Sequence, residues 1–277
     1  MITSFMITLR EGLEAFLVVG IILAYLAQTH REELKKYVYY GTGLAIAASL
    51  TAAGIFNLLA IQFAGRNEEL FEGIVMLLAA AVLTSMIVWM LKESAYIKGN
   101  IQQKVSQSAA TGLAVLAFVS VFREGIETVL FLGAAAVGAD QNTDMLIGGL
   151  AGLSVSLILV YVLFRSTVNL DIKMFFKVTS VFLVLFAAGL TAHGVHELQE
   201  AGVVPVIVEH VWDMNGILDE NGTVGSLAKS LFGYNGNPSL LEVLSYAGYY
   251  VLAYGFYRNI MKSDFSKSAA YVKPLTE

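Results

Sequence analysis

Long apolar runs separated by short polar segments follow one another along the whole chain. A helix that crosses a membrane needs about 20 mostly apolar residues, and seven such runs occur, at 4–27, 38–62, 70–91, 109–137, 145–164, 174–198 and 240–260. The segments between them are rich in Lys, Glu, Asn, Asp and Gly, which is typical of loops. The pattern predicts an all-α polytopic membrane protein, a single transmembrane domain with seven transmembrane helices.

Composition supports this prediction and excludes several classes of protein. Of the 277 residues, 57% are hydrophobic and only 14% are charged, whereas a soluble domain carries about 25% charged residues. This excludes a disordered chain, a coiled coil and a nucleic-acid binder. There is no cysteine, so disulfides, thiolate metal sites and cysteine nucleophiles are excluded. The first residues lack the basic region and cleavage site of a signal peptide, and we expect them to form the first membrane helix.

The positions of the basic residues predict the orientation, because cytoplasmic loops carry an excess of Lys and Arg. With the N-terminus outside, the outer side holds only Arg66 and Lys229, while thirteen of the 17 basic residues lie inside. The thirteen are Arg31, Lys35, Lys36, Lys92, Lys98, Lys104, Arg165, Lys173, Lys177, Arg258, Lys262, Lys267 and Lys273. We therefore expect an outer N-terminus and a cytoplasmic C-terminal tail at 261–277.

A five-residue motif occurs twice, in the first and in the fourth predicted helix. Residues 10–14 read R-E-G-L-E, and residues 123–127 read R-E-G-I-E, 113 positions later. Three predicted helices separate the copies, and an odd number of helices per repeat gives the two halves opposite orientations, as in the inverted repeats of many secondary transporters. We expect a 3+3 inverted repeat plus one helix. The parts are a first repeat at about 1–105, a second at about 106–200, an outer loop at about 200–239 and the seventh helix at 240–260.

The two motifs are expected to lie at similar depths in the membrane. At about 1.5 Å per residue, Glu11 lies roughly 10 Å from the outer end of its helix, and Glu124 lies roughly 22 Å from the inner end of its own. In a hydrocarbon core about 30 Å thick, both positions fall between the outer surface and the middle. The two motifs could therefore meet inside the helix bundle.

The charges of the motif are costly inside a membrane, at about 2.5–3.5 kcal/mol for one charged residue at a helix centre. One interpretation is purely structural: each Arg pairs with the second Glu of its motif, one helical turn away, and the Gly permits close helix packing. That interpretation does not explain the first Glu of each motif or the duplication. The other interpretation is a cation site, because carboxylate oxygens are hard ligands that suit hard cations.

The cation site would combine both copies of the motif. Its predicted ligands are Glu11, Glu14, Glu124 and Glu127, and Arg10 and Arg123 would balance their charge. The formal charge of these six residues is −2, which a divalent cation would neutralise. Adding Glu72, at the outer end of the third predicted helix, gives −3, which a trivalent cation would neutralise.

At these residues the sequence resembles the oxidase-dependent ferric iron permeases, and in particular their bacterial iron-uptake branch. The hallmark of that family is the R-E-G-L-E motif in the first and fourth of seven membrane helices. Ile126 replaces Leu in the second copy, which changes no ligand. Further similarity lies in residues 70–73, 194–200 and 232–239.

The resemblance implies a permease, and not an enzyme, that imports Fe(III) across the plasma membrane (the inner membrane in bacteria) with the motif glutamates as iron ligands. It implies no cofactor besides the transported ion. It also implies extracytoplasmic partners, which are a multicopper oxidase in fungi, or a haem peroxidase with an iron-binding delivery protein in bacteria. Some relatives are linked to lead uptake, so a divalent cation such as Fe(II) or lead stays the alternative.

Polar residues at the outer ends of the third and sixth predicted helices form a second candidate site. They could relay a metal ion inward, or they could be ordinary polar helix ends. They are Glu68, Glu69, His193, His196, Glu197 and Glu200. In the outer loop, 206–212 is expected to be an amphipathic lid, a partner-docking surface or a helix lying at the membrane interface. Glu242 is expected to be a simple helix-start acid.

Two other functions fit the sequence less well than transport. A membrane di-iron carboxylate oxidase typically needs Glu-x-x-His pairs, and the sequence contains none. A receptor-like subunit without transport activity is the other remote alternative. Direct ATP hydrolysis is not expected, because the sequence has no phosphate-binding P-loop.

Overall fold

The fold is a bundle of long helices. A computed structural model describes residues 1–93, 101, 104–106, 108–136, 142–165, 172–220 and 222–271, and these contain helices, turns and loops but no strand. The long helices are α1 (Ile2–Gln28), α2 (Lys35–Gln62), α3 (Arg66–Glu93), α5 (Ala110–Ala136), α6 (Asn142–Arg165), α7 (Ile172–Glu200) and α9 (Leu240–Tyr271). Two short ones are η1 (Glu32–Leu34) and α8 (Thr223–Phe232). Lys98 and Lys273 lie outside the described residues.

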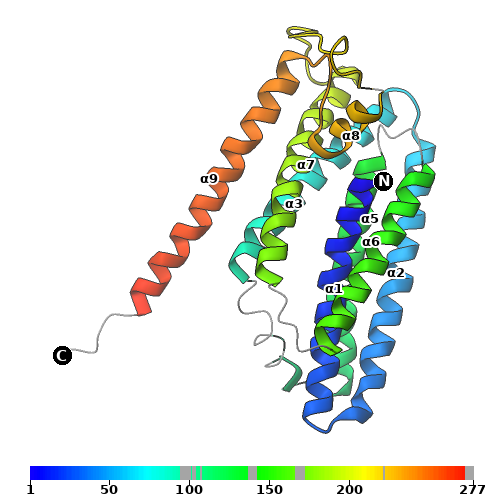
Figure 1. Ribbon diagram of the computed structural model, residues 1–277, viewed down its shortest axis with the longest axis vertical. Helices are drawn as coiled ribbons and strands as arrows, with labels where there is room; N and C mark the ends of the chain where they lie inside the picture. Colours follow the sequence, from blue (N-terminus) through cyan, green and yellow to red (C-terminus); the bar gives the residue numbers. More distant parts are fainter. Residues whose placement is uncertain are drawn as a thin grey trace, which may run out of the picture.

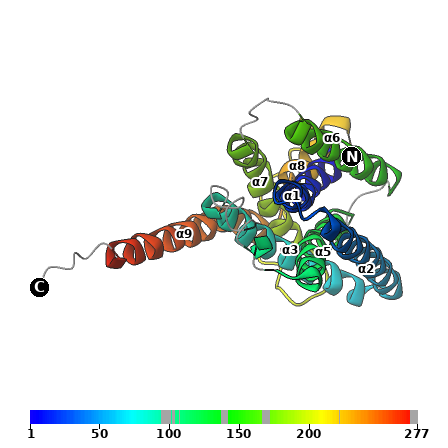
Figure 2. The ribbon, with the colours of Figure 1, turned by 90° about the horizontal axis from the view of Figure 1, so that it is seen from below.

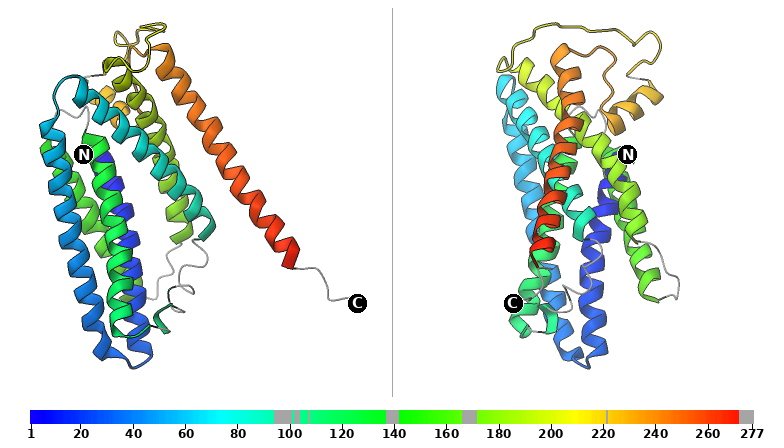
Figure 3. Two further views of the ribbon diagram at one scale, coloured as in Figure 1. Left: turned by 180° about the vertical axis from the view of Figure 1, so that it is seen from behind. Right: turned by 90° about the vertical axis from the view of Figure 1, so that its left-hand side faces the viewer.

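Successive long helices run in alternate directions (Figures 1 and 3). The N-terminus and the loop at 201–239 lie at one end of the molecule, which we call the loop end, and α9 ends toward the opposite end, the tail end. α1, α3, α6 and α9 run from the loop end to the tail end, and α2, α5 and α7 run back. The start of α2 at Lys35 and the end of α6 at Arg165 therefore face the tail end.

Each of the seven apolar runs predicted from the sequence coincides with one long helix. The largest difference is in α9, which continues to Tyr271 instead of ending near 260. Among the described residues, four helices are long and apolar enough to cross a membrane: Glu32–Gln62, Arg66–Met90, Thr143–Arg165 and Phe176–Glu200. α1 and α5 are not among these four, and each of them carries the three charged residues of one motif.

The helices pack in pairs that join the two halves of the sequence. α1 lies along α6, α2 along α5 and α3 along α7, and α1 also contacts α5 (Figure 2). A buried hydrogen bond ties α1 to α6, in which Thr8 Oγ1 donates to the carbonyl of Gly149 at 2.9 Å. The interior is apolar around Leu83, Phe131 and Phe186. The outer faces of α2 and α6 expose leucines such as Leu50 and Leu150, which suits a surface in contact with lipid.

α2 and α5 approach so closely that one position of α2 admits only glycine. A Cβ on Gly41 would overlap the backbone carbonyl of Ala114 in α5, whereas a Cβ on Gly43 would meet no atom within 4 Å. We expect Gly41→Ala to lower the free energy of unfolding by about 1–3 kcal/mol, because the helices must separate. Gly43→Ala is the matched control and should raise it by up to about 1 kcal/mol, because Ala is the better helix former. Thermal unfolding in detergent measures both, and equal melting temperatures for the two variants would contradict this close approach.

The loop at 201–239 differs from its expected structure. A helix at 206–212 is wrong, because the segment forms bends whose backbone pairs with the chain just before α9. The N–H of Val211 donates to Pro238 at 3.0 Å, and the N–H of Leu240 donates to Val208 at 3.1 Å. The helix of this loop is α8, which ends at Gly233 in the left-handed region (φ 67°). The Cα of Gly233 lies against Gly189 of α7 and so seats α8 on the bundle.

Candidate metal centre

The first copy of the motif is completely enclosed. Arg10 Nη1 lies 3.0 Å from Glu11 Oε1, and Arg10 Nη2 lies 3.3 Å from Glu14 Oε1. The Arg10 side chain is 0% exposed, and its Nη1 also donates to the sulfur of Met86 in α3 at 3.3 Å. Arg10 is therefore held between two carboxylates of its own helix and a thioether of a neighbouring helix.

The second copy has the same pairing in a more open setting. Arg123 Nη2 and Nε lie 2.7 Å and 3.0 Å from Glu124 Oε1, and Nε lies 3.5 Å from Glu127 Oε1. The Arg123 side chain is 46% exposed. Its guanidinium lies over the ring of Trp89 in α3, 5.1 Å from the ring centroid. The two copies thus differ mainly in the surroundings of their arginines.

Helical spacing predicts only some of the Arg–Glu ion pairs in the two motifs. The two contacts one helical turn apart, Arg10–Glu14 and Arg123–Glu127, are present. The shorter contacts are to the adjacent Glu11 and Glu124, which the sequence-based ion pairs left unexplained. Adjacent residues do not face each other on a helix, so helical spacing alone could not predict these contacts.

Three of the motif carboxylates converge where α1 meets α5. Carboxylate oxygens of Glu11, Glu124 and Glu127 lie within 4.8 Å of one another, and no other group of three or more His, Cys, Asp or Glu side chains in the described part of the chain is so close. The Oε2 atom of each of these glutamates is buried without a hydrogen-bond partner. A buried carboxylate oxygen without a partner is costly. These three carboxylates could together hold a cation, and we call them the carboxylate cluster.

The other two predicted ligands lie outside the carboxylate cluster. Glu14 interacts electrostatically with Glu124 and Arg123 across the helix interface. Glu72 has Glu68, Glu69 and Glu200 as its charged neighbours. The formal charge of −3, which favours a trivalent ion, includes Glu72, and Glu72 is not part of the cluster. The formal charge of −2 comes from the six motif residues alone.

The glycine of each motif faces away from the carboxylate cluster. A Cβ on Gly12 would crowd Ser156 of α6, and a Cβ on Gly125 would overlap Ser49 of α2. The glycines therefore let each motif helix pack closely on a helix from the other half of the sequence. On each motif helix the glycine thus faces a helix of the other half, while Glu11 on α1 and Glu124 and Glu127 on α5 converge.

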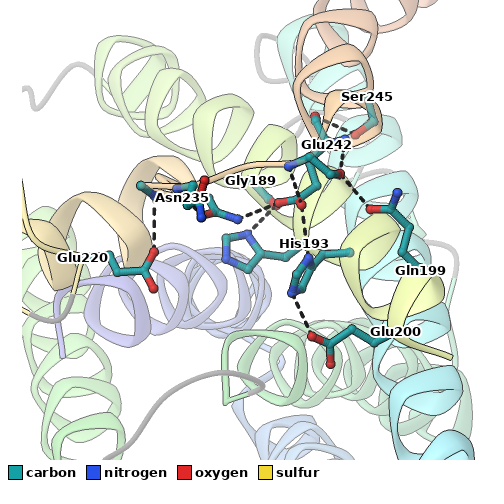
Figure 4. A network of polar contacts seen from close by, with 12 residues as sticks. Gly189, His193, Gln199, Glu200, Glu220, Asn235, Glu242 and Ser245 are labelled. Atoms are coloured by element: carbon teal, nitrogen blue, oxygen red, sulfur yellow. Dashed lines mark hydrogen bonds and ion pairs between the residues drawn. The ribbon is translucent and has the colours of Figure 1, made fainter. Parts of the chain in front are cut away.

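The second candidate site is part of a polar network at the loop end (Figure 4). His196 Nε2 lies 3.2 Å from Glu200, as helical spacing predicts, and His196 Nδ1 lies 3.1 Å from Glu242 Oε1. Glu242 is only 2% exposed, and it also accepts hydrogen bonds from the Asn235 amide at 2.7 Å and the Ser239 N–H at 3.0 Å. The expectation that Glu242 is only a helix-start acid is wrong, because it also joins α9 to α7.

The sequence contained a signal for part of this role. Ser239 and Glu242 have the S-x-x-E spacing of a capping box. The structure has both of its bonds, because the Glu242 N–H also donates to Ser239 Oγ at 3.3 Å. The bond to His196 is a contact between distant segments and had no such signal.

The remaining candidates at the loop end do not form a compact site within the described residues. His193 Nδ1 lies 3.2 Å from the carbonyl of Gly189 in its own helix. Glu197 has Glu72, Glu69 and Glu200 among its charged neighbours. A relay of metal ions through these side chains stays a prediction.

Comparison with known proteins gives one consistent result. The model of the Iron permease FTR1 family matches residues 1–261. The chain is similar to the ferrous iron permease EfeU of Escherichia coli O6:H1 (strain CFT073), with 36% identity over 249 residues, 88% of this chain and 90% of that protein. It is 34% identical to EfeU of Yersinia pestis over 260 residues, 91% of this chain and 92% of that protein. A protein of Archaeoglobus fulgidus is 35% identical over 257 residues, 90% and 91% of the two chains. No solved structure matches the chain.

Proposed function

The chain belongs to the iron permease FTR1 family, and on that premise we propose that it imports iron across the plasma membrane through the carboxylate cluster. Its family and its apolar helices make it a multi-pass membrane protein. Its relatives are permeases by name, which favours transport over an enzymatic activity. The observation that carries the proposal is the convergence of three buried carboxylates, each with an unpartnered oxygen, from the two motif helices.

We propose Fe(II) as the ion that the cluster binds. The formal charge of the two motifs is −2, so a divalent ion leaves the buried site neutral. The relatives in Escherichia coli and Yersinia pestis carry the name ferrous iron permease. Fe(III) is the second candidate, because three or four carboxylates are hard ligands that suit a trivalent ion.

A transport assay separates the two ions. Protein in liposomes is expected to take up iron that is kept ferrous by an excess of ascorbate, without any oxidase, at several times the rate measured for ferric citrate. Liposomes without protein give the background rate. If the protein takes up ferric iron but no iron under strict reduction, the proposal of Fe(II) is wrong and the proposal of iron transport stands.

We further propose that the seven long helices all cross the membrane as a 3+3 inverted repeat plus α9, with the loop end outside. The pairing of the helices supports the repeat. In such a repeat α1 corresponds to α5, α2 to α6 and α3 to α7, so the α1–α6 contact should have an equivalent between α5 and α2. Both contacts are present, and the contacts α3–α7 and α1–α5 join helices that correspond to each other. α1 and α5 also run in opposite directions (Figure 1). Basic residues at the tail end, such as Lys35 and Arg165, support the orientation.

The loop end is the proposed entrance. Its acidic residues, Glu68, Glu69 and Glu72 in α3 and Glu197 and Glu200 in α7, would raise the local concentration of cations. We propose that they pass iron toward the cluster and that an extracytoplasmic protein which delivers iron docks at this end. Such partners are those that the family resemblance implies.

A further inference from the structure

The two motif arginines, equivalent in sequence, have different freedom to move. Arg10 is 0% exposed and has Glu11, Glu14 and Met86 around it. Arg123 is 46% exposed and contacts Glu124, Glu127 and one face of Trp89. Arg123 can therefore leave its carboxylates without passing through packed side chains, whereas Arg10 cannot.

A cation that binds to the cluster must compete with Arg123. The Oε1 atom of Glu124 accepts two contacts from the Arg123 guanidinium, at 2.7 Å and 3.0 Å, while its Oε2 atom is unpartnered. A metal ion that uses both oxygens of Glu124, or draws the Glu127 carboxylate toward it, takes contacts away from Arg123. The guanidinium then keeps, of the contacts described above, the one with the ring of Trp89.

The indole of Trp89 is a favourable surrounding for the guanidinium. Its ring face lies 5.1 Å from the guanidinium carbon, within the distance at which a cation is attracted to an aromatic ring. Trp89 lies on α3, which also brings Met86 to Arg10. One helix therefore contacts both motif arginines, with a thioether at the enclosed one and an aromatic face at the open one.

We propose that Trp89 is a positioning residue for iron binding, which holds the Arg123 guanidinium when a metal ion displaces it from Glu124 and Glu127. Arg10 stays paired throughout, so the two copies of the motif have different roles: the first is the fixed part of the site and the second exchanges its arginine for the ion. This inference rests on the proposed iron site.

Uptake kinetics give the first test. Trp89→Leu is expected to raise the KM for iron about 3- to 30-fold, the range of one cation–π contact at a partly desolvated site, and to leave Vmax within about twofold. Trp89→Phe keeps an aromatic face and should fall between Trp89→Leu and the parent. Trp212→Phe, which alters the other tryptophan in the exposed loop, is the matched control and should leave KM unchanged. A loss of Vmax with unchanged KM in Trp89→Leu would indicate a merely structural role and overturn the proposal.

Fluorescence gives an independent test on folded protein. The chain has two tryptophans, so Trp212→Phe leaves Trp89 as the sole tryptophan, whose emission is excited selectively at the red edge of the absorption band. Zn(II) and gallium(III) citrate serve as non-quenching probes for divalent and trivalent ions. We expect a saturable change in Trp89 emission with the same midpoint as metal binding by equilibrium dialysis, and no such change when Arg123→Leu is added.

The outcomes separate this inference from the function on which it rests. Metal binding without a change in Trp89 emission, or with the same change in Arg123→Leu, would overturn the role of Trp89 and leave the iron site intact. Absence of metal binding to the parent protein would overturn both. Binding that is lost in Glu124→Gln but has no effect on Trp89 in the parent would likewise leave only the iron site.

Discussion

Glu124→Gln is expected to lower iron uptake at least about 10- to 100-fold. Changes to groups that only support a metal ligand already cost that much in affinity, and Glu124 is a proposed ligand whose oxygens lie within 4.8 Å of those of Glu11 and Glu127. The amide keeps the shape of the side chain but removes its charge. Glu11→Gln should have a similar effect from the other motif. Uptake of radioactive iron into cells or liposomes, normalised to the protein in the membrane, measures both.

The control for these variants is the same chemical change at an exposed acid. Glu33 lies in η1 at the tail end and is exposed, so Glu33→Gln should transport at the parental rate. Parental uptake in both Glu11→Gln and Glu124→Gln would show that the carboxylate cluster does not carry iron. Loss in only one of them would restrict the site to one motif.

Arg10→Leu is expected to destabilise the protein strongly. It leaves Glu11 and Glu14 without their common partner, and removal of one partner of a buried ion pair costs about 3–5 kcal/mol. The same change in the second motif, Arg123→Leu, should cost less, because the Arg123 side chain is 46% exposed whereas that of Arg10 is fully buried. The free energy of unfolding in detergent, followed by chemical denaturation, measures both.

A variant that keeps the charge separates electrostatics from packing. Arg10→Lys retains a positive charge beside Glu11 but makes fewer contacts than the guanidinium, so its stability should lie between those of the parent and Arg10→Leu. Equal destabilisation by Arg10→Leu and Arg123→Leu would contradict the difference in burial between the two motifs.

The helical framework follows from the sequence because it depends on local patterns. Runs of apolar residues define α1, α2, α3, α5, α6, α7 and α9 to within a few residues, apart from the end of α9. The short elements were missed: α8 has only ten residues, too few for the pattern used to find membrane helices. The segment at 206–212 is not the helix considered from the sequence. Its backbone pairs with residues some 30 positions later, and a local sequence pattern cannot predict such pairing.

The sequence predicts which glutamates belong to the candidate site, but not which three of them converge. Depth and duplication predict that the motifs meet, and they place four glutamates together. Which three converge depends on how α1 and α5 are rotated about their axes, and Gly12 and Gly125 allow these helices to pack closely on α6 and α2 in the observed rotation. The contacts of Met86 and Trp89 with the arginines come from α3. They link segments that are distant in sequence, so no spacing within the motif predicts them.

The packing of α1 on α6 has a consequence for biosynthesis. The hydrogen bond from Thr8 to Gly149 spans 141 residues, and at about 5–20 residues per second a ribosome needs roughly 7–30 s to cover that length. During this interval the newly made α1 lacks α6, the helix against which Thr8 and Gly12 pack. The nascent first helix therefore stays incompletely packed until the second half of the chain has been made.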